Sequence, residues 1–399
     1  MTKNKEIYSS NRSLRNQRYR KAKQHEFLER QTLKNHNNET FSLADCAAKN
    51  VSNPAIRRAE LMTRIRGFEQ VAEVCGHSAL FFTITTPSRM HRSLSKNSRL
   101  NPKFDGTTPN DAQQYLCRLW ERARAELHRL NISPYGFRVA EPHHDGTPHW
   151  HLLLFVRPEQ EEQLKSVLYR YSLQDSPNER GAKQRRMTVE HIDPSKGGAT
   201  AYIAKYISKN VDGEHLDEDL YGNDAKSSAQ RITTWASDHR IRQFQQIGGP
   251  SVTVWRELRK LKNTLTDSKA EEARLAADSS NWAAYTFAMG GPNMKASDRP
   301  IKPYYTHVEA VDLDTGEYVS LDTNKYGETC QKAIRGLSTN NMIIPTRTFV
   351  WSPGRRLKPL TSEALDSALG SLILSPKNDS EASVTWTCVN NCTETQAAH

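Results

Sequence analysis

Hydrophobic and polar positions in the middle of the chain predict a series of short strands separated by helices. Residues 78–86 are rich in aromatic and β-branched side chains and end before a proline, which is typical of a buried strand. Residues 135–141 and 149–156 flank the turn signal Asp145-Gly146, and this arrangement predicts a β-hairpin. A shorter strand is expected over residues 187–192. The pattern therefore predicts four strands, the second and third of which form a hairpin.

Helical patterns fill the gaps between these strands. Thr108 precedes Pro109 and stands three positions before Asp111, an order that predicts a capped helix start. Apolar residues then recur at helical spacing, at Tyr115, Leu116, Leu119, Trp120, Ala123, Leu127 and Leu130. A second helix is expected after Pro158, with Leu164, Val167, Leu168 and Tyr171 on its inner face. A third is expected over residues 200–210, after two glycines.

The order β-α-β-β-α-β, followed by one more helix, is the split βαβ or ferredoxin-like pattern. We therefore predict an α+β fold with an antiparallel sheet, in which the first and third strands lie side by side at the centre. A charged helical stretch is expected over residues 265–277, and strand-like pieces at 305–309 and 316–320. The polar tail from 375 to 399 is expected to be disordered.

The charge balance favours a polyanionic partner. The 399 residues include 56 Lys and Arg against 45 Asp and Glu, a formal net charge of +11. The polyanionic partner of such a chain is most often nucleic acid, and the alternative is a soluble protein that is basic without such a partner. Arginine and lysine are dense within the first 40 residues, which is typical either of an arm that grips phosphates or of a solvated tail.

Other classes of protein fit the sequence less well. No window approaches the roughly 18 uninterrupted apolar residues of a membrane span, and no signal peptide is visible. The six cysteines form no CxxC pair, so we expect free thiols and a cytoplasmic location. Cys388 and Cys392 lie close together near the C-terminus, where a metal or redox role is the alternative to a poorly ordered tail.

The predicted hairpin carries candidate metal ligands. His149 and His151 are two residues apart on a strand and therefore point to the same face, where two imidazoles can chelate one cation. Glu141 lies across the hairpin within side-chain reach and can add a carboxylate oxygen. Three ligands leave coordination positions open, and Mg²⁺ or Mn²⁺ would fill these with phosphate oxygens. His143 and His144 are competing ligands, and an HxH pair on a half-exposed strand also occurs by chance.

The last predicted helix carries a second candidate group. Tyr202 and Tyr206 are four residues apart and share one helical face, with Lys205 and Lys209 beside them. In isolation such a pair is typical of core-edge residues flanked by snorkelling lysines. Beside a metal it suggests nucleophiles, because a phenol with a pKa of about 10 needs a cation or a base to react at neutral pH. The lysines would hold the phosphate.

These motifs resemble those of HUH endonucleases, in which U is a bulky hydrophobic residue such as Trp150 here. The resemblance rests on the strand ending at residues 83–87, on His-Trp-His at 149–151 and on Tyr202-xxx-Tyr206. The longer phrases EPHHDGTPHWHLLLF, YIAKYISKN and IRQFQQIGGPSVTVWRELR resemble the replication gene A proteins of tailed bacteriophages, and the likeness spans residues 55–262.

The resemblance implies a role for each motif. His149 and His151 would bind the divalent ion with Glu141 as third ligand, and Tyr202 and Tyr206 would be the nucleophiles. Lys205 and Lys209 would lie near the phosphate. Together these seven residues make up the expected site. The implied activity is a nick in single-stranded origin DNA through a 5′-phosphotyrosine, which initiates rolling-circle replication in the bacterial host.

The resemblance also suggests four segments and a partner. Residues 1–70 would form a basic, helical or flexible segment, 71–215 the HUH endonuclease domain, 216–264 a family-specific extension and 265–399 a C-terminal region. The sequence has no GxxxxGK[ST] loop, so unwinding would need a host helicase and the replication machinery. Residues 244–250 suit either close DNA approach or a structural turn. Alternatives for the whole chain are a transposase or relaxase, a non-cleaving DNA-binding regulator, and a zinc hydrolase.

Overall fold

The computed structural model describes residues 6–35, 37–94, 99–193, 197–213, 218, 223–307, 309–311, 318–320, 332–347 and 351–355. It divides into two compact units, each discontinuous along the chain. The first, called the sheet unit here, comprises residues 1–21, 54–252 and 268–300, and the second comprises 22–53, 253–267 and 301–399. The four consecutive segments expected from the sequence remain a prediction.

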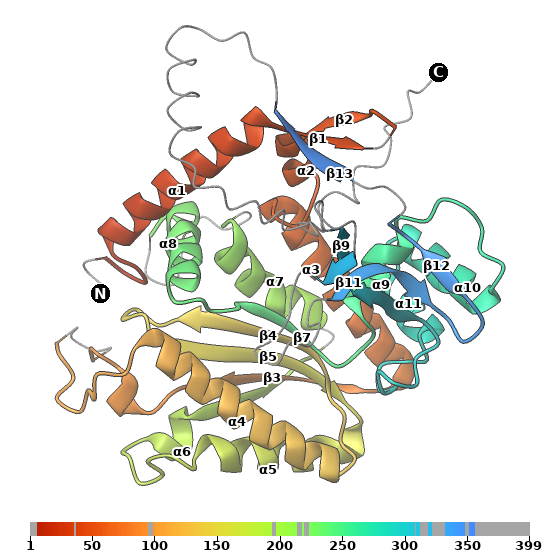
Figure 1. Ribbon diagram of the computed structural model, residues 1–399. Coiled ribbons are helices and arrows are strands. Elements are labelled where there is room, and N and C mark those ends of the chain that lie inside the picture. Colours follow the sequence, from red (N-terminus) through yellow and green to blue (C-terminus); the bar gives the residue numbers. More distant parts are fainter. Residues whose placement is uncertain are drawn as a thin grey trace, which may run out of the picture. The chain divides into compact units, whose positions relative to one another are not determined.

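A five-stranded sheet forms the centre of the sheet unit (Figure 1). Its strands are β3 (Ser78–Ile84), β4 (Tyr135–Pro142), β5 (Pro148–Val156), β6 (Met187–His191) and β7 (Phe244–Ile247). They pair in the order β6-β3-β5-β4-β7, and every pairing is antiparallel. The mixed helix-and-antiparallel-sheet class is thus confirmed, as is the central pairing of the first and third predicted strands. The outer strand β7 was not predicted.

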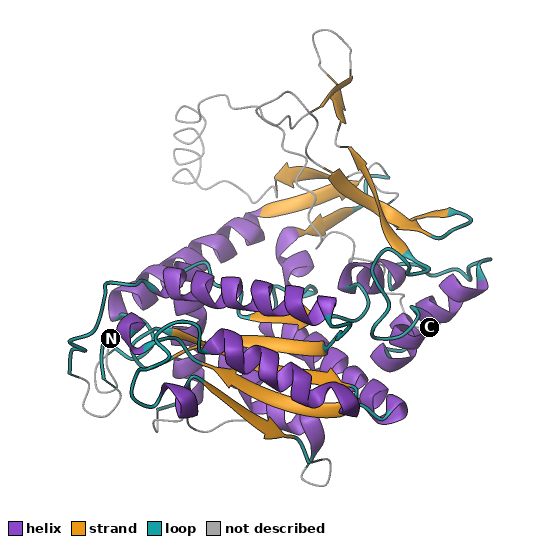
Figure 2. Cartoon of the chain, turned by 90° about the horizontal axis from the view of Figure 1, so that it is seen from below, coloured by secondary structure: helices purple, strands orange, loops and turns teal. Residues whose placement is uncertain are grey.

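One face of this sheet is closed by α4 (Pro109–Arg129) and α5 (Glu161–Ser172), with the short helix α6 (Ala182–Arg185) beside them. In the view of Figure 2 these helices lie across the strands. The predicted capping box at Thr108 and Asp111 is present at the start of α4. Apolar side chains from α4 and α5 pack on those of the sheet, including Leu80, Phe82, Leu116, Leu119, Trp150, Leu152, Leu154 and Leu164.

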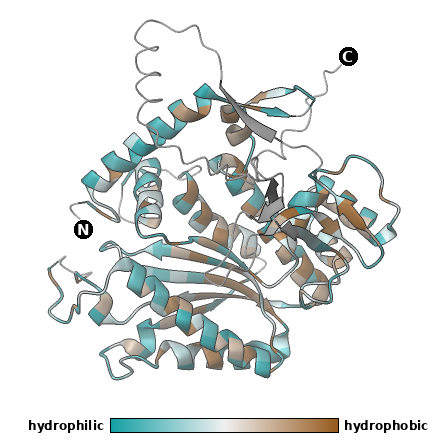
Figure 3. Ribbon diagram, in the orientation of Figure 1, coloured by the Kyte–Doolittle hydropathy of each residue, from teal (hydrophilic) through white to brown (hydrophobic). Residues whose placement is uncertain are grey.

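The opposite face of the sheet is covered by α3 (Pro54–Cys75), α7 (Gly198–Val211) and α8 (Ala225–Asp238). Ile203 and Ile207 of α7 are buried, as the sequence predicted. The first turns of α1 (Asn11–Arg30) pack on α8, where Gln17 accepts a hydrogen bond from Thr234. In Figure 3 most of the residues of α1 are hydrophilic, whereas the strands of the sheet contain many hydrophobic residues.

The turn after β7 has a structural role. Gly248 and Gly249 both have positive φ angles, of 59° and 68°. A Cβ on Gly249 would lie 2.4 Å from Cζ of Phe68, a residue of α3 that also packs edge-on against Tyr135. Of the two alternatives for residues 244–250, a turn held by close packing explains both glycines. Helices α10 (Ser268–Asp278) and α11 (Trp282–Ala288) pack next to each other, and α11 contacts α3.

The second unit contains small sheets. Strands β1 (Gln31–Asn35), β2 (Thr40–Ser42) and β13 (Trp351–Arg355) form one, and α2 (Leu43–Ala48) directly follows β2. Strands β8 (Lys302–His307), β11 (Lys332–Ser338) and β12 (Ile343–Pro345) form another, while β9 (Glu309–Val311) pairs with β10 (Tyr318–Ser320). The strand pieces expected near 305 and 318 are therefore found, and α10 corresponds to the predicted charged helix.

The remaining elements are α9 (Val252–Leu258) and two 3-10 turns, η1 (Ser88–Met90) and η2 (Pro158–Gln160). The helix that the sequence predicts after Pro158 therefore consists of the 3-10 turn η2 followed by α5. The tail from 375 to 399 and three of the cysteines, at 330, 388 and 392, lie outside the described residues. No helix among the described residues combines the length and apolar composition needed to cross a bilayer.

Candidate metal and tyrosine site

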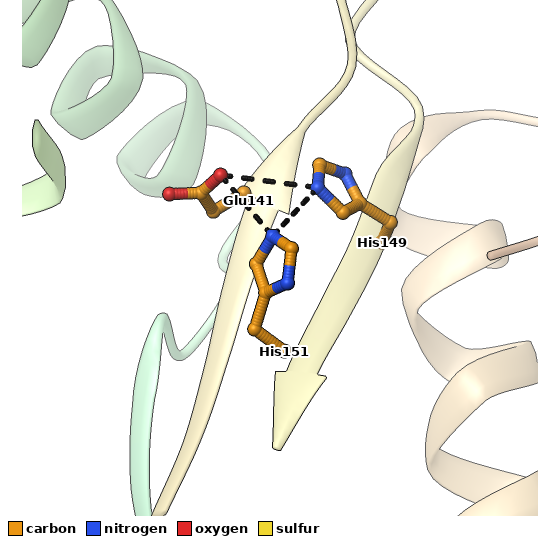
Figure 4. Close-up of side chains that lie close together, drawn as sticks. All are labelled: Glu141, His149 and His151. Atoms are coloured by element: carbon orange, nitrogen blue, oxygen red, sulfur yellow. Dashed lines mark hydrogen bonds and ion pairs between the residues drawn. The ribbon is translucent and has the colours of Figure 1, made fainter. Parts of the chain in front are cut away.

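Glu141, His149 and His151 converge at one point on the face of the sheet that α7 covers (Figure 4). Glu141 is directly opposite His149 in the β4–β5 register. Nε2 of His149 lies 3.0 Å from Nε2 of His151, and these nitrogens lie 3.8 and 3.4 Å from Oε2 of Glu141. Alternation along β5 therefore brings both imidazoles to the carboxylate, as the sequence predicted.

The protonation states of this cluster suit a cation. Burial alone would raise the pKa of Glu141, but Lys209 and His151 lower it to about 2. Burial lowers the pKa of His149 well below its usual value, and the neighbouring cationic groups act in the same direction. The cluster thus presents a carboxylate and a neutral imidazole, the forms that bind metal ions.

The surroundings of the two imidazoles support the same fit. Oγ1 of Thr83 lies 3.0 Å from Nδ1 of His151, and an Nδ1–H donated to this hydroxyl leaves the Nε2 lone pair directed at the cluster. Nδ1 of His149 is buried without a hydrogen-bond partner. Two nitrogens and one carboxylate oxygen within 4.8 Å of one another form a donor set that suits a divalent ion with open positions.

The end of α7 contacts both carboxylate oxygens of Glu141, including the Oε2 that faces the imidazoles. Nζ of Lys209 lies 3.1 Å from Oε2 of Glu141, and the side-chain amide of Asn210 donates to Oε1. Gln243, next to β7, donates in turn to Oδ1 of Asn210 at 3.3 Å. Glu141 and Lys209 are almost completely buried, with 1 % and 8 % of their side chains exposed. Both carboxylate oxygens of Glu141 therefore have a defined partner.

The two tyrosines of α7 lie beside this cluster and share one hydrophobic support. The ring of Phe81, on β3, lies 4.6 Å from that of Tyr202 and 5.1 Å from that of Tyr206. The ring of Tyr206 also lies 4.3 Å from that of His151. The tyrosine rings are 6.3 Å apart, which is consistent with their predicted position on one helical face.

The two hydroxyls have different surroundings. Tyr202 donates a hydrogen bond to Oε2 of Glu190, an exposed residue of the edge strand β6. Burial, and then this hydrogen bond, raise the pKa of Tyr202 well above its usual value. Burial and the charges of Glu141 and Glu190 raise the pKa of Tyr206 to about 12. Both phenols are therefore protonated at neutral pH in the protein alone.

Helix α7 is tied to α3 at both ends, which fixes the position of the tyrosines. The carboxylate of Glu69 accepts hydrogen bonds from the backbone N–H groups of Ala199 and Thr200 at the start of the helix. Such a carboxylate accepts hydrogen bonds from backbone N–H groups that have no partner within the helix, and its negative charge is stabilised by the positive end of the helix dipole. At the other end, Arg58 forms an ion pair of 2.9 Å with Asp212.

The two competing histidines point elsewhere. The ring of His143 packs on that of His149 at 4.1 Å, and its Nε2 is buried without a hydrogen-bond partner. Nε2 of His144 lies 3.4 Å from the hydroxyl of Ser93. Within the described ranges, only Glu141, His149 and His151 form a group with metal-ligand geometry.

The structure brings six of the seven expected residues together, and the sequence analysis missed several of their partners. Lys209 contacts Glu141, whereas Lys205 is exposed. Thr83 and Asn210 belong to the quoted motifs, but neither was assigned a role. Glu190 had no signal in the sequence. Gln243 could have been found only through the phrase that it shares with the family.

Comparison with known proteins agrees with this arrangement. Residues 1–214 match the family described as bacteriophage replication gene A protein. The chain belongs to this family. The candidate metal ligands and the two tyrosines fall within the matched range, whereas Gln243 lies outside it.

Two phage proteins align with nearly the whole chain. The replication protein of Haemophilus phage HP1 is 40 % identical over 395 residues, which cover 96 % of this chain and 48 % of that protein. The replication gene A protein of Escherichia phage 186 is 38 % identical over 410 residues, covering 100 % of this chain and 55 % of its own length.

A bacterial relative carries an activity in its name. A protein of Salmonella paratyphi A named "probable replication endonuclease from prophage-like region" is 36 % identical over 302 residues, which cover 71 % of this chain and 38 % of that protein. This gene A family chain spans about half the length of the curated phage relatives it matches. No solved structure matches it.

Proposed function

We propose that this chain is a site-specific endonuclease and strand transferase that nicks single-stranded origin DNA and initiates rolling-circle replication of phage DNA. In this proposal a tyrosine attacks the phosphodiester and stays attached to the new 5′ end. The observation that carries the proposal is the packing of Tyr206 against His151, at a ring separation of 4.3 Å, beside a carboxylate–imidazole cluster. Family membership and a relative named as a replication endonuclease support the same reaction class.

We further infer that the sheet unit contains a ferredoxin-like HUH core. The four strands β6-β3-β5-β4 follow the order expected of a split βαβ fold, with helices α4 and α5 as its crossovers. His149-Trp-His151 lies on the central strand β5, and the tyrosines lie on the helix that follows the fourth strand of that core. This arrangement supports the assignment of the HUH motif.

The proposed mechanism assigns a task to each side chain. Glu141, His149 and His151 would hold a Mg²⁺ or Mn²⁺ ion, which supplies polarisation of the scissile phosphate when bound. Lys209 stands 3.1 Å from Glu141 and would balance charge as the phosphate arrives. Lys205, exposed on α7, would contact the DNA backbone. Tyr202 and Tyr206 would supply two nucleophiles, so a second attack can occur while the first tyrosine holds DNA.

Charge and surface support DNA as the partner. The chain carries a net charge of +11, and the exposed side chains of Arg12, Arg15 and Lys21 extend the cationic surface of α1. Phosphate contacts of this kind supply affinity without sequence choice. The chain has no P-loop sequence, so we propose that a host helicase unwinds the duplex.

A covalent-adduct assay tests the proposal. Purified protein is incubated with origin-containing single-stranded DNA and Mg²⁺ or Mn²⁺, and is run on a denaturing gel beside Tyr202→Phe, Tyr206→Phe and the double variant. We expect a shifted band that needs the metal and is absent from the double variant. DNA binding without any adduct would instead support a non-cleaving regulator, and an activity that requires zinc and spares DNA would support a hydrolase.

A further inference from the structure

The hydroxyl of Tyr202 already has a proton acceptor. Its hydrogen bond reaches Oε2 of Glu190, and Glu190 is directly opposite Phe81 in the pairing of β6 with β3. Because cross-strand partners share one face of a sheet, Glu190 and Phe81 both face α7. Phe81 supports the ring of Tyr202 at 4.6 Å, while Glu190 receives its hydroxyl. Two residues that are cross-strand partners therefore position the ring of Tyr202 and accept the hydrogen bond from its hydroxyl.

Tyr206 lacks an equivalent acceptor. Its ring lies against His151, and in the described part of the chain no hydrogen bond from its hydroxyl is found. Glu141 and Glu190 act on Tyr206 through their charges alone. They raise the pKa of Tyr206 but accept no hydrogen bond from its hydroxyl. The two tyrosines therefore differ in chemistry as well as in position, although they share a helical face.

We propose that Glu190 is the general base for Tyr202 and has no such role for Tyr206. This inference rests on the proposed function. In the forward step the proton of Tyr202 passes to the Glu190 carboxylate as the phenolic oxygen forms a bond to phosphorus. The bond from phosphorus to the 3′ oxygen breaks, and that oxygen leaves as a hydroxyl after it takes a proton from water. In the resealing step the 3′ hydroxyl gives its proton to water as its oxygen bonds to phosphorus. The bond from phosphorus to the tyrosine oxygen breaks, and Glu190 returns a proton to the departing phenolate.

Exposure of Glu190 suits this task. The residue lies on an edge strand and is exposed, so its carboxylate can exchange the proton with solvent between turnovers. A phenol is a weak nucleophile while protonated, and a positioned base contributes about 10²–10⁴-fold to such a step. Tyr206, next to the metal ligands, would instead rely on the bound cation for its activation. The site would then activate its two nucleophiles in two different ways.

Glu190→Gln separates proton transfer from positioning. The amide oxygen of glutamine can still accept the hydrogen bond from Tyr202, but the amide cannot take the proton. Thr188→Ala is the matched control, because Thr188 is also exposed, lies two residues away on the same face of β6 and is opposite Thr83. Glu190→Asp is a second variant, which keeps a carboxylate with a shorter reach.

The chain offers a convenient readout. Trypsin cleaves after lysine, so residues 197–205 carry Tyr202 and residues 206–209 carry Tyr206 on separate peptides. The adduct is formed with an origin oligonucleotide, and in a second sample the preformed adduct is challenged with another origin strand. After nuclease trimming, mass spectrometry measures the share of phosphotyrosine on each peptide over time.

We expect Glu190→Gln to slow the appearance of the Tyr202 adduct by roughly 10²-fold or more. The Tyr206 adduct should change by less than about threefold, Thr188→Ala should behave as wild type, and Glu190→Asp should recover part of the rate. Equal slowing at both tyrosines, no slowing at either, or a wild-type protein that never modifies Tyr202 in either sample would overturn the inference. Absence of any adduct from the wild type would instead contradict the proposed function itself.

Discussion

The two faces of the five-stranded sheet use the same strands for different purposes. On the face covered by α4 and α5, Trp150 and Leu152 of β5 enter a continuous apolar core. On the face covered by α7, the alternating residues His149 and His151 meet a carboxylate, a lysine and two tyrosines. A single strand of nine residues therefore serves both the core and the candidate site.

The difference shows how the side chains of the site can be held in defined positions although so many of them are polar. Apolar packing on the first face fixes the backbone of β5, and alternation then fixes where the imidazoles point. On the second face, the order comes from charge pairs and hydrogen bonds around Glu141. We expect substitutions on the two faces to separate activity from stability.

The largest effect should follow from His151→Ala. Loss of one of the three proposed ligands would remove most of the metal-based polarisation, which is worth several kcal/mol, so the adduct rate should fall by about 10³-fold or more. The thermal unfolding midpoint should move by only a few degrees, because Glu141 keeps Lys209 and Asn210. Gel-based rates and circular dichroism check both parts, and near-normal activity would remove His151 from the site.

Leu152→Ala, one residue along on the other face, should have the opposite profile. Leu152 is fully buried, and truncation of such a side chain costs about 2–5 kcal/mol in the free energy of unfolding. The adduct rate of the folded protein should stay within about threefold of wild type. Urea titration and rate measurements on the same sample test this, and a large rate loss without destabilisation would contradict the division between faces.

The charge of Glu141 should give the functional face an acid-sensitive contribution. Burial opposes ionisation, yet Lys209 and His151 hold the pKa at about 2, below the ordinary value of about 4.3. A lowered pKa stabilises the fold above the unfolded value, and the contribution is lost as the pH falls towards 2. In EDTA, wild type should lose about 3 kcal/mol more than Glu141→Gln between pH 5 and pH 2. Equal losses in the free energy of unfolding for the two proteins between pH 5 and pH 2 would contradict this prediction.

The smallest effect should concern exposed cations on α1, which packs on α8, and on α4. Arg12→Ala/Arg15→Ala removes two exposed cations from α1, and Arg118→Ala/Arg124→Ala is the control on α4. Binding of single-stranded DNA by the tyrosine-free variant should show a salt slope lower by about 1.4 for the α1 variant, because each phosphate that is no longer neutralised lowers the slope by about 0.7. The α4 variant should keep the wild-type slope. Equal slopes in all three proteins would leave α1 without a role in DNA binding.

Local patterns were sufficient to predict much of this arrangement from the sequence. Strand alternation and one hairpin turn bring Glu141 to His149 and His151, and helical spacing brings Tyr202 and Tyr206 to one face. These relations depend only on neighbours along the chain or across one turn. They required no knowledge of how the helices pack.

The missing parts depend on contacts between distant segments. Glu69 reaches the start of α7 across 130 residues, and Gln243 reaches Asn210 from the segment before β7. Lys205 and Lys209 appear equivalent in the sequence, yet helix packing buries Lys209 against Glu141 and leaves Lys205 exposed. Side-chain spacing along a helix does not reveal such differences, since burial is decided by what packs on each face.

The most direct test of the account is the metal dependence of the adduct. Wild type and His149→Ala/His151→Ala are incubated with origin DNA in EDTA, and excess Mn²⁺ is then added. The account predicts no adduct in EDTA, rapid recovery by wild type after addition of Mn²⁺, and no recovery by the double variant. An adduct that forms equally well in EDTA, or that the double variant forms at the wild-type rate, would contradict a cation site on this face of the sheet.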